Sequence, residues 1–396
     1  MIEQSVQKLI SYCERDNFKG WDPYDGLNSR VFKLTPFKHS RTARLIWIQL
    51  FKKLPLNLRK LFLIKKEYNP KGLALMIEGY CNLYQLCIIE NKHADKSSHI
   101  KEKIIFLSDK LLEIKNKEFS GDCWGYNFDW QARKLFFFPK HTPTIVPTAF
   151  CVSALINSYK ITNNKKYLKS AISANNFVKK DLLRTKNEFG LFMSYSHISG
   201  NNTVINASLM SAKILLLNYQ FTKNKNDLLL AKEIISSACR SQNNDGSWPY
   251  GLLKVQSWID SFHTGYNLEI LSLYSNISKD ESFKQNHKIG LKYYLDNFFD
   301  DKGRSKYYND TLYPIDIHSP AQLPVTLYHS RKIKQHNKQL LRVLNWTVKN
   351  MQNNEGSFDY QIYKFYRISI PYFRWSNAFM FYGLTFFMLG RKNETI

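Results

Sequence analysis

Acidic residues are scarce in this sequence of 396 residues: 32 Asp and Glu stand against 57 Lys and Arg, which gives a formal net charge of +25. Glycine and proline are also few, with 16 and 12 copies, so collagen-like and Pro/Gly-rich disordered chains are excluded. Hydrophobic residues nevertheless make up 44% of the chain and aromatic residues 15%. This composition predicts a folded chain with a large core, and the charge indicates anionic partners.

Several motifs that mark common sites are missing as well. The sequence has no P-loop, no G-x-G-x-x-G after a strand and no G-x-S-x-G turn. It contains no DNA- or RNA-reading module. The six cysteines show no CxxC or Cys/His spacing and read as small buried hydrophobes in a reducing compartment. We therefore predict no cofactor, no metal and no nucleic-acid partner.

No run is long and apolar enough to predict a membrane-spanning helix. The longest uncharged apolar stretch, from Trp375 to Gly390, is shorter than the roughly 20 residues that a spanning helix needs, and we predict a buried helix there. The first 16 residues are amphipathic and carry acids, unlike a secretory signal. These features predict a cytoplasmic protein.

The positive charge is concentrated between Arg30 and Lys71, which hold twelve Lys and Arg and one acid, Glu67. Apolar and basic residues alternate along this stretch, as in segments that lie on anionic lipid headgroups. A basic face on an ordinary pair of packed helices is the alternative. We expect the stretch to hold the protein at the anionic surface of the inner membrane.

Apolar residues recur at helical spacing in successive pairs of segments. The predicted pairs are 71–91 with 100–115, 145–160 with 165–181, 204–220 with 225–240, 264–277 with 282–297, and 319–331 with 336–352. A last helix, 376–390, has no partner after it, and the helix predicted at 2–15 supplies one. Strand signals are sparse and lie in the loops.

The loops after the second helix of each pair repeat a Gly followed closely by aromatic residues. These loops begin at Gly121, Gly190, Gly246, Gly303 and Gly356. A regular period of this kind marks a repeat architecture, in which each unit buries its face on its neighbours. We therefore predict an all-α fold, an (α/α)6 toroid of helical hairpins with the Gly-aromatic loops at one end. Residues 71–396 form the toroid, and 1–70 supply its closing helix and the basic segment.

Two of these loops resemble turns of known toroids. SQNNDGSW at 241–248 and MQNNEGSF at 351–358 are similar to the Q-x-x-D/E-G-S-W/F turn of terpenoid cyclases, prenyltransferase β-subunits and many carbohydrate-active enzymes. The resemblance implies the fold. The D-x-D-D and D-D-x-x-D acid motifs of terpenoid cyclases are absent, which weakens that option.

Three further segments resemble a poorly characterised family encoded in bacterial O-antigen and capsule loci. They are GWDPYDGLNS at 20–29, PLNLRKLFLIKKEYNPKGLAL at 55–75 and YPIDIHSPAQ at 313–322. The similarity spans nearly the whole chain. It implies a role in the assembly or modification of surface polysaccharides, and it supplies no mechanism.

Acid–base chemistry is predicted from two Asp/His pairs. Asp260 and His263 are one helical turn apart, and the carboxylate can set the pKa of the imidazole. Asp260 as a helix N-cap is the alternative. Asp316 and His318 alternate in an extended segment and so point the same way. If the four meet over the ring, they suit proton abstraction or glycosidic bond cleavage.

Aromatic and charged residues of the same loops are the predicted substrate contacts. Aromatic rings stack on sugar rings, although filling the interior is the alternative for these side chains. By analogy with toroidal lyases and epimerases, Tyr126 near an arginine is a further acid or base. The predicted binding residues are Trp124, Trp130, Arg133, His141, Trp248, Tyr250, Glu269, Tyr360, Arg374 and Asp25.

These observations lead to three hypotheses. The first is an epimerase, lyase or hydrolase that acts on an anionic glycan or lipid-linked saccharide in surface-polysaccharide biosynthesis. The second is a glycan-binding or assembly protein without catalysis, which needs the aromatic residues and arginines but not the Asp/His set. The third is a prenyl or terpenoid enzyme, which an apolar funnel without charged lining would favour.

Overall fold

The computed structural model describes residues 1–91, 94–132 and 137–393. In this described part, six mostly buried helices form an inner ring, because each packs on the next and the last packs on the first. They are α4 (Pro70–Ile89), α6 (Ile145–Thr162), α8 (Ile205–Thr222), α10 (Ser261–Ser278), α12 (His318–His329) and α14 (Phe379–Asn393). Helices that are apolar on all sides need such a position.

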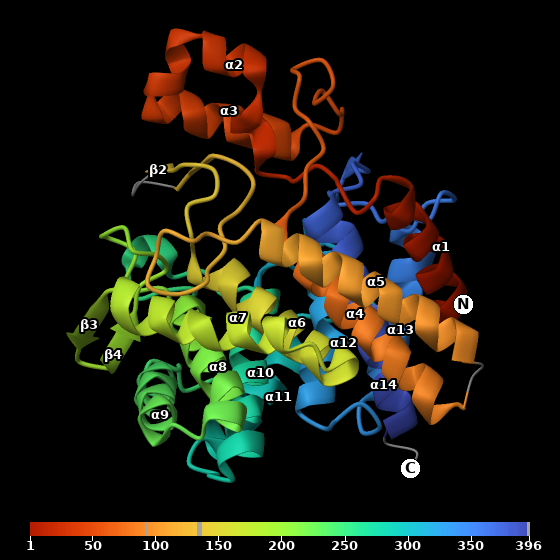
Figure 1. Cartoon of the computed structure of the whole chain (residues 1–396). Helices are drawn as coiled ribbons and strands as arrows, with labels where there is room; N and C mark the ends of the chain where they lie inside the picture. Colours follow the sequence, from red (N-terminus) through yellow and green to blue (C-terminus); the bar gives the residue numbers. More distant parts are fainter. Residues whose placement is uncertain (92–93, 133–136, 394–396) are drawn as a thin grey trace.

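A second layer of amphipathic helices surrounds the ring (Figure 1). Helix α13, for example, buries Leu340, Val343, Leu344, Thr347 and Met351 at helical spacing. The outer helices of the described residues are α5 (Ala94–Glu113), α7 (Lys165–Asn176), α9 (Lys225–Arg240), α11 (Lys284–Asn297), α13 (Asn337–Met351) and α1 (Ile2–Arg15). The predicted (α/α)6 fold is confirmed.

Helix α1 takes the sixth outer position, against α13 and α14. The repeated loop motif shows why. Gln242 Nε2 donates to the carbonyls of Gly246 and of Asn286 in α11, at 2.8 and 3.1 Å. Gln352 Nε2 donates to the carbonyls of Gly356 and of Ser5 in α1, at 2.9 and 3.0 Å. The glutamine of each motif thus hydrogen-bonds its own loop to the next outer helix, and Gln352 contacts α1 in the way that Gln242 contacts α11.

The Gly of these motifs lies in the turn after the helix rather than in a left-handed cap at its end. Helix α9 ends at Arg240, and Gly246 (φ +94°) follows six residues later. A Cβ at Gly246 or Gly356 (φ +100°) would meet a helix carbonyl oxygen of Ile289 or Lys8 at 2.5 or 2.3 Å. Only glycine fits both this φ and this close approach.

Short elements decorate the loop end of the ring. Three small antiparallel sheets are β1–β2 (Trp130–Gln131, Phe137–Phe138), β3–β4 (Arg184–Asn187, Gly190–Met193) and β5–β6–β7 (Ile315–Asp316, Gln361–Ile362, Arg367–Ile368). Single helical turns are η1 (Asp25–Asn28), η2 (Pro36–His39), η3 (Phe177–Asp181), η4 (Lys254–Gln256) and η5 (Phe373–Ala378).

Residues 30–65, which we call the cap, stand above the loop end of the ring (Figure 1). The cap contains α2 (Arg30–Leu34) and α3 (Arg41–Lys53). Trp47 stacks on Phe32 with ring centroids 4.9 Å apart. Buried Arg59 anchors the cap, since its guanidinium binds the Asp25 carboxylate at 2.8 Å. Arg59 and Lys71 of the basic stretch are both buried and so are not part of its surface.

Helix α4 is the one described helix that is long and apolar enough to cross a membrane, but 78% of its apolar window is buried inside the ring. The stretch 375–390 is likewise buried, largely in α14. All six cysteines are buried and unpaired. These segments build the core of the toroid.

The loop geometry gives a first prediction. Gly356→Ala places a Cβ against the Lys8 carbonyl and forces a left-handed φ on alanine, so we expect a loss of more than about 1 kcal/mol in the free energy of unfolding. Glu355→Ala, an exposed change in the same turn, is the control and should cost less than about 1 kcal/mol. Equal melting temperatures for the two variants would contradict this role of α1.

Candidate active site

A cavity of about 260 Å³ opens at the loop end of the ring. The starts of all six inner helices reach it, because a closed ring of parallel inner helices brings these ends together. They contribute Lys71 (α4), Val146 (α6), Asn206 (α8), His263 and Tyr266 (α10), His318 (α12) and, just before α14, Arg374 and Trp375. Four of the Gly-aromatic loops add Tyr126, Tyr195, Tyr250 and Tyr307. Four of the five Gly-aromatic loops thus meet at one end of the ring, as predicted.

The cap forms one wall of this cavity. Leu45, Ile48, Gln49 and Lys52 of α3 line it, and Lys52 Nζ donates to the Tyr24 hydroxyl at 2.9 Å. These four residues share one side of α3 through their helical spacing. Access to the cavity therefore depends on the position of the cap.

His263 is held by Asp260, as the sequence predicted. Asp260 caps α10 by accepting from the His263 backbone N–H at 3.0 Å, and its other oxygen lies 2.7 Å from His263 Nδ1. Trp258 Nε1 donates to the same oxygen at 3.2 Å. A carboxylate at Nδ1 keeps the proton there, so Nε2 is left as the basic nitrogen. Asp260 serves both as N-cap and as the positioning group, and it lies behind the cavity lining.

His318 belongs to a second group with Tyr266 and Lys71. His318 Nε2 lies 2.7 Å from the Tyr266 hydroxyl, to which Lys71 Nζ donates at 3.2 Å. Burial, together with the positive charge of Lys71, lowers the pKa of His318 well below its usual range. Burial and the nearby Arg374 charge likewise lower the pKa of Lys71. The environment therefore disfavours the charged form of both groups.

Asp316 does not reach the cavity, which corrects its assignment as a catalytic acid or base. One carboxylate oxygen accepts from the His318 backbone N–H at 2.9 Å and from Trp375 Nε1 at 3.0 Å, and the other accepts from Gln361 Nε2 at 2.5 Å. Burial raises the pKa of Asp316 to about 6. Asp316 is a positioning residue that orients His318 and Trp375.

Arg374 faces the cavity with its charge held by Asp22. Nε and Nη2 donate to the two Asp22 oxygens at 2.6 and 2.8 Å. The guanidinium also lies 5.0 Å from the ring centre of Tyr126. Burial raises the pKa of Tyr126 to about 12, so this phenol is a proton donor at neutral pH and not a base. Arg374 and Tyr126 are placed to hold an anionic oxygen.

Three aromatic walls are placed to stack a sugar ring. Trp130 lies parallel to Phe138 at 5.2 Å, and Tyr250 lies nearly parallel to Trp258 at 4.5 Å. Trp130, Tyr250 and Trp258 all line the cavity. The Tyr250 ring is also 4.8 Å from the His263 ring, so an aromatic ring and an imidazole lie together on the cavity lining.

Several predicted contacts lie outside the cavity. The indoles of Trp124 and Trp248 fill the core and donate to the carbonyls of Leu111 and Ala238, and Tyr360 is buried behind Trp375. Interior filling, the alternative for such aromatics, holds for these three.

The charged residues of that set are engaged elsewhere. Glu269 binds Lys213 at 2.5 Å inside the ring, Asp25 binds Arg59 under the cap, and the side chain of His141 is exposed. Arg133 lies outside the described residues. These assignments as substrate contacts are corrected because none of the described side chains borders the cavity.

Sequence reasoning missed Lys71, Tyr266 and Lys52. Lys71 was grouped with the basic surface, yet it stands at the second position of a helix whose next residues are all apolar and buried. A cation at the start of a fully buried helix is the signal that would have found it.

The cavity lining contains no Asp or Glu among the described residues. Its titratable side chains are two histidines, two lysines, an arginine and tyrosines. No group of three or more His, Cys, Asp or Glu in the described ranges is arranged to hold a metal ion. The chemistry available here is proton transfer by imidazole, amine and phenol.

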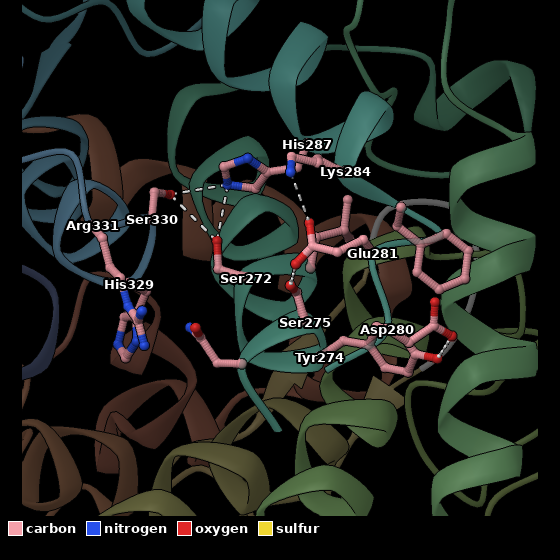
Figure 2. A pocket seen from close by; sticks show the side chains of 13 residues that line it. Ser272, Tyr274, Ser275, Asp280, Glu281, Lys284, His287, His329, Ser330 and Arg331 are labelled. Carbon is pink, nitrogen blue, oxygen red and sulfur yellow. Dashed lines mark hydrogen bonds and ion pairs between the residues drawn. The ribbon is translucent and has the colours of Figure 1, made fainter. Parts of the chain in front are cut away.

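A smaller cavity of about 130 Å³ lies near the other end of α10, between α10, α11 and the end of α12 (Figure 2). His287 Nε2 lies 2.9 and 3.0 Å from the hydroxyls of Ser272 and Ser330. Burial lowers the pKa of His287 to about 4, and among the described residues no carboxylate holds its other nitrogen. The described residues around His287 thus do not supply the third member of a nucleophilic triad, and the larger cavity at the loop end is the candidate active site.

No protein-family model and no curated protein sequence matches this chain. Solved structures do match it. A sugar epimerase from a ruminal bacterium has 12% identity over 100% of this chain and 99% of that chain, with a TM-score of 0.63. An unsaturated glucuronyl hydrolase specific for heparin has 11% identity over 100% and 97%, with a TM-score of 0.63.

A family 76 glycoside hydrolase, a mannosidase of Bacteroides thetaiotaomicron, has 8% identity over 99% of this chain and 100% of that chain, with a TM-score of 0.62. Similarity at this level of identity establishes the shared (α/α)6 fold and leaves the activity to be argued from the site.

The hydrogen bond from His263 to Asp260 gives a second prediction. Asp260→Asn would donate to Nδ1 and shift the proton to Nε2, so we expect turnover to fall by about 100-fold or more. The amide oxygen can still cap α10, but the new amide N–H would face the Trp258 Nε1 donor, so we expect a modest fall in the melting temperature. Turnover equal to that of the wild type would show that His263 does not act as the base.

Lys71 gives a third prediction. Because its pKa is lowered on folding, the unfolded chain binds the additional proton, and stability rises with pH in the range below about 10.4. Lys71→Met removes this cost and should raise the free energy of unfolding at neutral pH by about 1 kcal/mol or more, while flattening its pH dependence. Urea denaturation at several pH values measures both.

Lys213→Met is the matched control, because Lys213 is equally buried but paired with Glu269. Removing one partner of a buried pair costs about 3–5 kcal/mol. If Lys71→Met lowers the free energy of unfolding as Lys213→Met does, Lys71 stabilises the fold and is not a destabilising group that function retains.

Proposed function

We propose that this chain is a carbohydrate-active enzyme that moves a proton at a sugar carbon, as epimerases and lyases do. The observation that carries the proposal is the pair of histidines, His263 and His318, which line one cavity and whose rings both contact the rings of Phe262 and Tyr266. Sugar epimerases among the matching folds support it. The aromatic walls beside His263 fit a sugar ring.

His263 Nε2 acts as the base that removes a proton from a carbon next to a carbonyl or carboxylate. The electron pair moves to that oxygen, where Arg374 stabilises the developing charge. In an epimerase the proton returns to the opposite face, from the His318–Tyr266 pair. In a lyase the pair of electrons instead expels the β-substituent, with a protonated group donating to the leaving oxygen.

Hydrolysis is less well supported by the cavity. Retaining and inverting glycosidases use two carboxyl groups on either side of the bond. The described lining of this cavity contains none, and Asp260 and Asp316 lie behind it with both oxygens occupied. This favours epimerase or lyase chemistry over the hydrolase alternative.

An anionic substrate fits the charge of the cavity. Lys52 of the cap has no carboxylate partner among the described residues, and the starts of the inner helices add positive dipole ends, whereas the charge of Arg374 is shared with Asp22. This charged lining also opposes the prenyl or terpenoid alternative. The resemblance to the O-antigen and capsule family supports a uronate or a lipid-linked saccharide of surface-polysaccharide biosynthesis as substrate.

The fourth prediction separates these reactions. In D2O, the purified protein should incorporate deuterium into a uronate oligosaccharide or a disaccharide such as cellobiose, as followed by proton NMR. His263→Gln and His318→Gln should each slow incorporation by about 100-fold or more. His141→Gln, an exposed histidine outside the cavity, is the matched control and should leave the rate unchanged.

Two outcomes would support a different function. Release of sugar with oxygen from labelled water and no deuterium on carbon would establish hydrolysis. Saccharide binding that survives both histidine substitutions but is lost in Trp130→Ala, with no turnover of any substrate, would establish the glycan-binding alternative.

A further inference from the structure

The cap carries an unusual share of the exposed apolar surface. Of the eighteen large hydrophobic side chains that are exposed in the described residues, eight lie between residues 31 and 63. Leu34, Phe37, Ile46 and Leu61 are exposed by 87, 61, 64 and 71%. This concentration in one segment makes the cap a candidate interaction surface.

The same segment carries free positive charge. Some of its cations are used internally: Arg59 binds Asp25, and Lys33 binds Asp129. For six exposed cations the structure shows no carboxylate partner among the described residues: Arg30, Lys38, Arg41, Lys53, Lys60 and Lys65. The cap contains no acidic residue of its own.

Helix α3 separates this surface from the cavity. Leu45, Ile48 and Lys52 line the cavity, whereas Ile46, Leu50 and Lys53 are exposed on another side of the helix. The exposed residues follow i, i+4 and i+7 spacing, so they form a stripe. The apolar stripe is thus not a by-product of lining the cavity.

We infer that the cap docks on the surface of an anionic lipid bilayer and holds the cavity entrance beside it. The charge and the apolar side chains are complementary to headgroups and to the acyl boundary, respectively. Nucleic acid would match the charge but would leave Leu34, Phe37 and Leu61 in water. A symmetric contact with a second copy would bring the six cations against themselves.

This docking is independent of the proposed reaction, and binding alone tests it. The full chain is mixed with vesicles of phosphatidylcholine with phosphatidylglycerol, or of phosphatidylcholine alone, and separated by flotation. We expect binding to the anionic vesicles that weakens with added salt, and little binding to the neutral ones.

A matched pair of variants locates the contact. Leu34→Ser with Lys38→Glu changes two exposed cap residues four apart, and Lys225→Glu with Leu229→Ser makes the same changes on α9. The cap variant should bind anionic vesicles at least about tenfold more weakly, with an unchanged melting temperature. The α9 variant should bind as the wild type does.

Three results would overturn the inference. One is the absence of wild-type binding to anionic vesicles at low salt, and another is an equal loss in both variants. The third is a dimer in sedimentation velocity that the cap variant dissociates, or duplex DNA binding that the cap variant abolishes, with the vesicles left unbound.

Discussion

Closure of the helical ring is the constraint on which the rest of the structure depends. An inner helix such as α4 or α8 is apolar on every side and is stable only between two neighbours and an outer helix. Helix α1 completes the last hairpin, tied to the final loop by Gln352. Because every inner helix then begins at the same end, six backbone starts and their first side chains share one cavity.

The cavity holds groups that a protein core does not ordinarily accept. Lys71 and His318 are buried with lowered pKa values, and Nδ1 of His318 has no hydrogen-bond partner among the described residues. Such groups lower the stability of the fold, and proteins keep them where function requires them. By contrast, Lys213 and Glu269 neutralise each other deeper in the ring. Lys71, whose hydrogen bond goes to the neutral Tyr266 hydroxyl, lacks such a carboxylate partner among the described residues.

The fold could be predicted from the sequence because the period of the loops and the apolar spacing of the helices are local signals. The site could be predicted only in part. His263 and Asp260 are one turn apart, so their contact follows from helix geometry. From the sequence, Asp316 and His318 are expected to point the same way. In the structure the Asp316 carboxylate instead accepts a hydrogen bond from Gln361, 45 residues away on the paired strand, and does not reach the cavity. Which residue of such a pair faces the substrate is set by distant contacts.

The cap shows why the number of basic residues in a stretch does not predict which of them lie on the surface. Arg59 and Lys53 belong to one basic run, yet Arg59 is buried against Asp25 and Lys53 is exposed. The buried ion pair fixes the cap to the toroid, and this leaves α3 with one side on the cavity and another toward solvent. Helix α3 therefore contributes both to the cavity lining and to the exposed surface of the cap.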